Sequence, residues 1–162
     1  MIIIQDFREK HGHHNEIFEY CKENDILLYR MKLEVGDYML GTFENGKYKP
    51  IGNKSIDTKG GGLAELASDL YKDKLSFNKK YRKCFDNKIQ LYVLVEQEVK
   101  TLRDIVTWSS PHTRVNGRLL LDMIDRLRKS YGVKFVFCPK NQTAQYIIKI
   151  LTEDNNNGNR LQ

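Results

Sequence analysis

Cysteine is scarce in this sequence, and long apolar runs are absent. The three cysteines, Cys21, Cys84 and Cys138, lie far apart and form no CxxC pair. This spacing gives no support to a zinc knuckle or to a disulfide framework, so we expect three reduced thiols, some of them in the core. The apolar runs, such as residues 89–95, are far shorter than the roughly 18 residues that a membrane span requires.

The amino terminus also lacks the pattern of a signal peptide. It is apolar for only four residues and then becomes charged, whereas a signal peptide carries a longer apolar core. We therefore expect an intracellular protein with no membrane partner. The 162 residues, of which 40% are hydrophobic and 30% charged, suit one globular domain with a core of its own.

Positive charge is concentrated in one short segment. The formal net charge of the chain is +6, which weakly favours a polyanionic partner. The segment 72–88 contains only two acids but many basic residues, namely Lys72, Lys74, Lys79, Lys80, Arg82, Lys83 and Lys88. Aromatic residues alternate with these charges, so the segment is either a solvated helix face or a surface that contacts phosphates.

The apolar pattern predicts a strand-rich first half, followed by helices and strands in alternation. Predicted strands lie at residues 2–7, 26–33, 37–43, 48–52, 54–59, 88–96 and 133–138. Predicted helices lie at residues 15–23, 63–85 with a break near residue 73, part of 101–113, 114–131 and 141–151. We expect a turn or a bulge at Gly36, a hairpin at Asn45 and Gly46, a helix stop at Gly132 and a helix cap at Asn141.

This order of elements predicts an α/β fold. A mixed central β-sheet flanked by helices on both faces fits it best. No linker interrupts the pattern, so we expect one domain over residues 1–152. The remaining residues, 153–162, are polar and are expected to be a disordered tail.

The segment "SIDTKGGG", residues 55–62, contains the first chemical signal. Side chains two apart on a strand share one face, so Asp57 and Lys59 project together while Thr58 points elsewhere. A carboxylate can hold a hard divalent cation, and a lysine can orient water or stabilise charge that develops on a phosphate. An isolated D-x-K triplet is most often a surface ion pair, so the pair needs support from other residues.

Further acids are available for such a site, since Mg²⁺ needs more than one carboxylate. Asp6 ends the first strand and is followed by Arg8 and Glu9, Asp37 follows Gly36, and Glu65 lies just beyond the glycines. The histidines of "HGHH", residues 11–14, are either a transition-metal site or, more in keeping with their surroundings, an exposed loop.

Together, "IIIQDFREK", "LEVGDYML" and "SIDTKGG" resemble the nuclease domain of the XPF-type structure-specific endonucleases, within the PD-(D/E)xK nuclease superfamily. The apolar strand "QLYVLVE", which ends in an acid, and the pair Thr143-Ala144 in the last helix are also similar to that family. The resemblance covers residues 1–152. It implies a restriction-endonuclease-like core built on the mixed sheet.

The resemblance also implies roles for individual residues. Asp37 and Asp57 would be ligands of Mg²⁺ or Mn²⁺, and Lys59 would be the catalytic lysine. Asp6, Arg8, Glu9 and Glu65 are implied as further active-site residues. Lys74 would be the basic residue near DNA, and we expect the neighbouring basic residues to bind DNA with it, namely Lys72, Lys79, Lys80, Arg82 and Lys83.

Two features depart from the family pattern. The family has E-R-K where this chain has Asp57, Thr58 and Lys59, so an arginine is replaced by threonine. The stretch between Lys59 and Glu65 is also about two residues longer. Its glycines either let the chain turn sharply beside the site or form a flexible loop.

The leading hypothesis is a metal-dependent DNA endonuclease, a hydrolase of phosphodiester bonds. The resemblance implies branched, flap or junction DNA as the substrate, a role in DNA repair or recombination, and a homodimer or a partner that supplies a DNA-binding module. The protein would act in the cytoplasm or nucleoid of a bacterium or phage-infected cell, or in a nucleus. The alternatives are a catalytically silent DNA-binding or scaffolding subunit, and a nuclease like the Holliday-junction resolvases.

Overall fold

The computed structural model of the protein describes residues 1–8, 15–72 and 74–153. Within these ranges the chain alternates strands and helices much as the sequence predicted. The strands are β1 (Ile2–Asp6), β2 (Leu27–Met31), β3 (Tyr38–Glu44), β4 (Lys47–Lys59), β5 (Gln90–Glu96) and β6 (Lys134–Cys138). The helices are α1 (Asn15–Glu23), α2 (Gly62–Lys72), α3 (Lys74–Asp86), α4 (Leu102–Val106), α5 (Gly117–Tyr131) and α6 (Thr143–Thr152).

All the described strands join one mixed sheet, in the order β2-β1-β3-β4-β5-β6. β3 runs antiparallel to both of its neighbours, whereas the pairs β1–β2, β4–β5 and β5–β6 are parallel. The carboxyl ends of β1 and β4 therefore lie on either side of the start of β3, at the same edge of the sheet. This edge brings together three segments that are far apart in the sequence.

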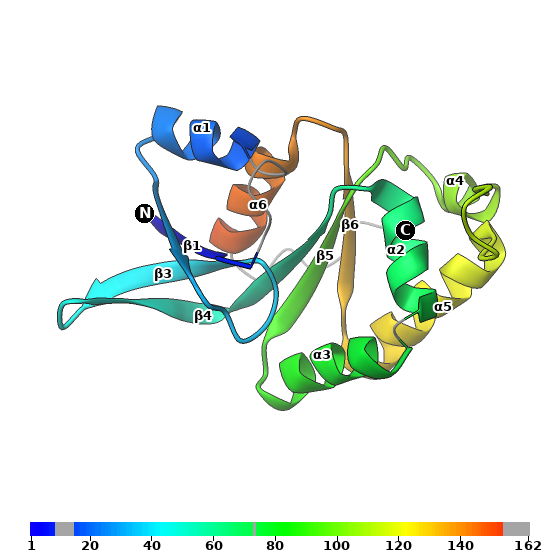
Figure 1. Ribbon diagram of the computed structural model, residues 1–162, viewed down its shortest axis with the longest axis horizontal. Helices are drawn as coiled ribbons and strands as arrows, with labels where there is room; N and C mark the ends of the chain where they lie inside the picture. Colours follow the sequence, from blue (N-terminus) through cyan, green and yellow to red (C-terminus); the bar gives the residue numbers. More distant parts are fainter. Residues whose placement is uncertain (9–14, 73, 154–162) are drawn as a thin grey trace.

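Helices cover both faces of the sheet, as Figure 1 shows. α1 and α6 pack against one face in a cluster that includes Ile17, Ile56 and Ile147. α2, α3 and α5 pack against the other face, around residues such as Leu66 and Val93. The predicted fold class, an α/β fold with a mixed central sheet flanked by helices, is confirmed.

The hairpin between β3 and β4 projects from one end of the molecule (Figure 1). Its turn residues, Asn45 and Gly46, have φ angles of 53° and 75°, as a tight two-residue hairpin turn requires. The predicted separation of residues 48–52 and 54–59 into two strands is wrong, because both belong to β4. The register between β3 and β4 shifts between the pairs Leu40–Ile51 and Tyr38–Ile56. Gly52 lies in this irregular stretch with a φ of 77°, so β4 continues through it as one strand.

The ends of α5 and α6 can be compared with the helix cap and helix stop that the sequence predicted. α5 begins after Asn116, whose side chain accepts a bond from the Leu119 amide at 3.0 Å, and it ends at Gly132 with φ 64°. The prediction of Asn141 as the cap of α6 is wrong, because Gln142 occupies that position. Asn141 instead has φ 68° and turns the chain out of β6, a conformation that asparagine tolerates better than most residues.

The cysteines behave as expected, since all three are buried free thiols. Burial raises the pKa of Cys21 and of Cys84 to about 11, so these two thiols stay protonated near neutral pH. Across the part of the chain that the structure describes, no helix combines the length and the apolar character needed to cross a bilayer.

Candidate active site

The acid and the lysine of "DTK" meet at the carboxyl end of β4. The Lys59 ammonium lies 2.9 Å from Asp57 Oδ2, and both side chains are buried, with 2% of Asp57 and 7% of Lys59 exposed. Their shared direction follows from the alternation of side chains along β4. Lys59 also contacts Asp69 Oδ2 at 2.9 Å, so one ammonium bridges the strand and helix α2.

A second lysine contacts the other oxygen of the same carboxylate. Lys80, on α3, pairs with Asp57 Oδ1. Burial by itself raises the pKa of Asp57, but Lys80 and Lys59 outweigh burial and hold the pKa below its ordinary value. Burial lowers the pKa of Lys59, yet the carboxylates of Asp57 and Asp69 raise it overall, so Lys59 remains a cation.

Asp37 is fixed beside this pair by the backbone of β4. Its amide donates to the Ile56 carbonyl at 2.6 Å. Its carboxylate accepts from the Thr58 amide at 2.6 Å and from Thr58 Oγ1 at 2.9 Å. Thr58, which stands where the resembling family has arginine, therefore orients Asp37 by two hydrogen bonds.

Gly36 allows this close approach of the segment before β3 to β4. Its φ is 70°, and a Cβ atom built there would lie 2.1 Å from Ser55 Oγ and 2.7 Å from the Ile56 carbonyl oxygen. Only glycine fits this combination of conformation and space. Of the turn or bulge expected at Gly36, the structure has a bend with a positive φ, which places Asp37 against β4.

Asp6 anchors the neighbouring segment, at the end of β1. Its carboxylate is 2% exposed and accepts from the Leu33 amide at 2.8 Å. It also accepts from the Arg8 amide and Nε, both at 2.8 Å, and from Arg8 Nη2 at 2.7 Å. Burial raises the pKa of Asp6, but these bonds from Arg8 and Leu33 lower it overall. The Asp6 amide in turn donates to the Asp37 carbonyl at 2.8 Å, which links the two acidic segments.

These side chains surround an open pocket of about 390 Å³. The pocket is lined by Asp6, Arg8, Glu34, Val35, Gly36, Asp37 and Lys80. The structure thus brings together four of the residues predicted for the site, Asp6, Arg8, Asp37 and Lys80, in one lining. Asp57 and Lys59 are linked to this pocket through the contact between Lys80 and Asp57.

The carboxylates at this edge of the sheet are the side chains that could hold the divalent ion implied by the resemblance. Among the residues that the structure describes, no group of three or more His, Cys, Asp or Glu side chains gathers closely enough to hold a metal ion. Asp37 and Asp57 nevertheless offer the carboxylate oxygens that Mg²⁺ takes, and backbone carbonyls and water can complete its octahedron. The Lys80 ammonium already places a positive charge against Asp57. Asp37 and Asp57 are therefore the residues that would hold a divalent cation.

Glu65, the helical acid named from the sequence, makes a different contact from Asp69 on the same helix. The Glu65 carboxylate accepts from the Gly61 amide at 2.6 Å, so it stabilises the glycine turn at the start of α2. Asp69, one turn further along α2, is the acid that contacts Lys59. Sequence reasoning missed Asp69, although the stretch of two extra residues after Lys59 was a signal that the helical acid had shifted. The catalytic role predicted for Glu65 stays a prediction.

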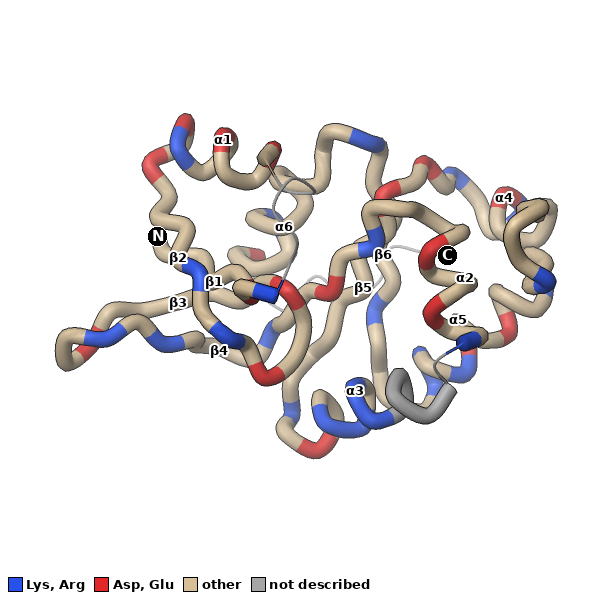
Figure 2. Tube along the Cα trace, in the orientation of Figure 1, with Lys and Arg blue, Asp and Glu red and all other residues tan. Residues whose placement is uncertain are grey.

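The basic segment divides into two groups of side chains. Lys72, Lys79 and Arg82 are exposed, and Figure 2 shows basic positions following one another along α3. Lys80 and Lys83 instead face the site. Lys80 pairs with Asp57, and Lys83 pairs with Glu34, which lines the pocket. Glu9, the histidines of residues 11–14 and the residues after Glu153 lie outside the described residues, as does the side chain of Lys74.

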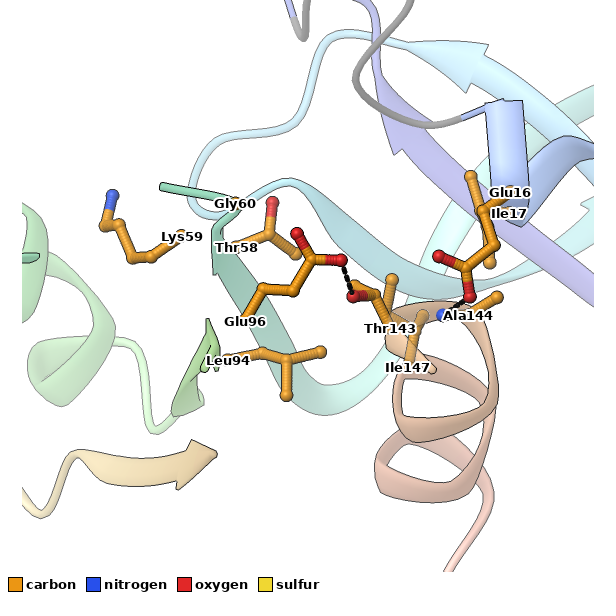
Figure 3. A pocket seen from close by; sticks show the side chains of 10 residues that line it. All are labelled: Glu16, Ile17, Thr58, Lys59, Gly60, Leu94, Glu96, Thr143, Ala144 and Ile147. Atoms are coloured by element: carbon orange, nitrogen blue, oxygen red, sulfur yellow. Dashed lines mark hydrogen bonds between the residues drawn. The ribbon is translucent and has the colours of Figure 1, made fainter. Parts of the chain in front are cut away.

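A second, much smaller cavity lies on the other side of β4. Figure 3 shows Thr58 there beside Glu96 and Thr143, while the Lys59 side chain extends away from them. Thr143 Oγ1 donates to Glu96 Oε1 at 2.8 Å. The cavity has a volume of about 20 Å³, so there is room for one water molecule at most.

Comparisons with known proteins support the fold. No protein-family model matches the sequence, and no curated protein matches it either. Among solved structures, XPF from Aeropyrum pernix superposes with a TM-score of 0.65 at 14% sequence identity, over 93% of this chain. The chain has the fold of XPF. A second structure of XPF from the same organism, in complex with DNA, gives a TM-score of 0.62 at 15% identity over 96% of this chain.

The matched proteins are longer than this chain. The alignment covers 63% of the first XPF chain and 68% of the second. The fold expected from "GDY", "DTK" and the strand order is thereby confirmed. The residues that the resemblance assigned to catalysis, metal binding and DNA binding remain predictions that the geometry above makes specific.

Proposed function

We propose that this chain is a metal-dependent DNA endonuclease that hydrolyses phosphodiester bonds. The observation that carries the proposal is the placement of Asp37 against the end of the strand that carries Asp57 and Lys59. Asp57 and Lys59 form a buried ion pair on β4, and Asp37 is held against the same strand by Thr58. The XPF fold, which one of the matched structures shows in complex with DNA, supports DNA as the substrate.

In this proposal each side chain has a separate task. Asp37 and Asp57 would hold Mg²⁺ or Mn²⁺, and such an ion, when bound, polarises the phosphate and lowers the pKa of coordinated water. Hydrolysis forms a bond from a water oxygen to phosphorus and breaks the bond to a bridging oxygen, while negative charge grows on the phosphate. The attacking water gives up a proton to solvent, and the departing oxygen takes one up from solvent. Lys59 is a cation because its pKa is raised. Its task would therefore be to stabilise that charge and to orient water, and not to remove a proton.

Asp69 and Thr58 would act through the residues that they position. Asp69 holds the Lys59 ammonium between α2 and β4, so Lys59 cannot turn freely towards solvent. Thr58 binds the Asp37 carboxylate through its amide and its hydroxyl. Arg8, whose side chain is 56% exposed and lies in the pocket lining, would be available to a phosphate oxygen while it stays paired with Asp6.

Branched, flap or junction DNA is the substrate class that the resemblance to XPF-type nucleases favours. The exposed Lys72, Lys79 and Arg82 lie along α2 and α3, on the same helices that carry Asp69 and Lys80 to the site. A phosphate backbone that follows these helices would reach the pocket. A second copy of the chain, or a partner with a DNA-binding module, would supply the further contacts that selection of a branched structure needs.

One observation favours a second function, a catalytically silent DNA-binding subunit. Asp57 is neutralised by two lysines at once, Lys59 and Lys80. A permanent arrangement of this kind would exclude a divalent ion from Asp57. The two functions share the basic helices and differ in whether Asp57 can accept a metal.

Cleavage of defined DNA substrates separates the two functions. Labelled flap, fork, four-way and plain duplex DNA are incubated with the protein and Mg²⁺ or Mn²⁺, beside Asp57→Asn and beside Asp122→Asn, an exposed acid on α5. We expect cleavage that needs the metal, falls at least about 100-fold in Asp57→Asn and is unchanged in Asp122→Asn. Binding of DNA without cleavage, equal in all three proteins, would instead establish the silent subunit.

A further inference from the structure

Two lysine–carboxylate pairs connect helix α3 to residues in or beside the pocket. Lys80, which lines the pocket, pairs with the buried Asp57, and Lys83, one turn further along the helix, pairs with Glu34 of the lining. Both lysines belong to the segment that the sequence assigned to DNA. In the structure each of them is engaged with a carboxylate of the protein instead.

The two pairs differ in their exposure to water. Lys83 and Glu34 have side chains 47% and 76% exposed, so water screens their attraction. Asp57 has a side chain only 3% exposed, whereas that of Lys80 is 28% exposed. The Lys80 pair therefore joins a buried anion to a cation that has a route to solvent.

The local charge balance shows why Lys80 matters for a metal. Asp37, Asp57 and Asp69 carry three negative charges, and Lys59 and Lys80 carry two positive charges. A divalent ion added to this group would leave an excess positive charge beside the buried Asp57 and Lys59. If Lys80 left when the ion arrived, the same group would be neutral.

We propose that Lys80 is an exchangeable counter-ion for Asp57 that competes with the divalent metal. This inference rests on the proposed metal site at Asp37 and Asp57. Lys80 neutralises Asp57 in the metal-free protein and withdraws when the ion binds. It is a positioning residue, because it acts on the metal through Asp57.

In the proposed reaction, a phosphate of DNA would be the new partner of the released Lys80 ammonium. Its side chain lines the same pocket as Arg8, where a phosphate of DNA would have to enter to reach Asp37. A lysine on a flexible four-carbon stem can turn from a carboxylate to a phosphate oxygen without movement of its helix. Metal loading would thus free a cation for DNA at the moment when the site becomes competent.

The test is Mn²⁺ binding to the intact protein without DNA, measured by isothermal titration calorimetry. In Lys80→Met we expect the dissociation constant for Mn²⁺ to fall about tenfold, because a charge-assisted bond no longer competes for Asp57. Lys83→Met removes the same charge from the next turn of α3, and its Mn²⁺ affinity should change less than about threefold, since its pair is exposed. Lys80→Arg keeps the charge and adds bidentate geometry, so Mn²⁺ should bind no more tightly than in the natural protein.

Asp57→Asn separates failure of the inference from failure of the proposed function. If Asp57→Asn removes Mn²⁺ binding while Lys80→Met and Lys83→Met bind alike, the metal site stands and the inference about Lys80 is overturned. If the natural protein shows no Mn²⁺ binding that depends on Asp57, the proposed metal site fails, and the inference fails with it. Thermal unfolding of each variant establishes that the proteins compared are folded.

Discussion

Replacement of Asp6 by asparagine should destabilise the fold more than any loss of surface charge would. The Asp6 carboxylate is buried and accepts four hydrogen bonds, three from Arg8 and one from the Leu33 amide. Asparagine has the same shape but only one acceptor oxygen. In either orientation of the amide, two donors of the protein would face an NH₂ group.

The magnitude follows from which bonds are lost. If the amide nitrogen takes the Oδ2 position, the buried Leu33 amide loses its acceptor, which costs about 1–3 kcal/mol. The pair with Arg8, whose side chain is 56% exposed, adds roughly 0.5–1 kcal/mol. A total of about 1.5–4 kcal/mol would lower the melting temperature of a domain of this size by roughly 3–16 °C.

Equilibrium unfolding in urea, followed by circular dichroism, measures this loss. The matched control is Asp122→Asn on α5, an exposed position at which the free energy of unfolding should change by less than about 0.5 kcal/mol. A loss below about 1 kcal/mol in Asp6→Asn would refute the reasoning, because it would mean that the Leu33 and Arg8 contacts do not hold the site together. A destabilised variant that still binds Mn²⁺ normally would identify Asp6 as an anchor of the segment before β3.

Two further predictions concern the same edge of the sheet. Gly36→Ala should lower the free energy of unfolding by about 3 kcal/mol, because the new Cβ clashes with Ser55 and the positive φ adds strain. Gly46→Ala introduces the same φ strain in open space, so it should lower the free energy of unfolding by only about 1 kcal/mol. Equal effects of the two substitutions would contradict the close approach of Gly36 to β4. The pKa values of Asp6 and Asp57 are depressed in the folded protein, so their contribution to stability is present above the unfolded value near pH 4 and is lost as the pH falls through the lower folded values. Melting temperatures recorded from pH 7 to pH 2.5 should therefore drop below about pH 4, and a melting temperature that stays level or rises in acid would count against these pairs.

Most of the fold could be predicted from local patterns in the sequence. The Asn45-Gly46 turn and the stop at Gly132 depend on φ angles that few other residues adopt, and the structure has positive φ at all three. The helices and strands followed from apolar periodicity, which reports the face that each element buries. The prediction at Asn141 was wrong because asparagine is favoured both as a helix N-cap and at turn positions with a positive φ. An asparagine just before a helix is therefore compatible with either role.

Part of the candidate site could also be predicted from residues close together in the sequence. Asp57 and Lys59 had to share a face once residues 54–59 were a strand, because alternation is a property of the backbone. The order of strands was not local, since it depends on which segments pair across the sheet. That order places β3 between β1 and β4, and it is the reason that Asp37 lies beside Asp6 and Thr58.

The sequence by itself determined the elements, the fold class and the Asp57–Lys59 pair, because these depend on residues a few positions apart. Only the tertiary structure decided which charges meet: Asp69 with Lys59, Lys80 with Asp57, and Asp6 with the Leu33 amide. Lys80 looked like one more surface charge of a basic helix. It became part of the site because α3 packs against the face of the sheet to which Asp57 projects, where the Lys80 ammonium pairs with the buried carboxylate.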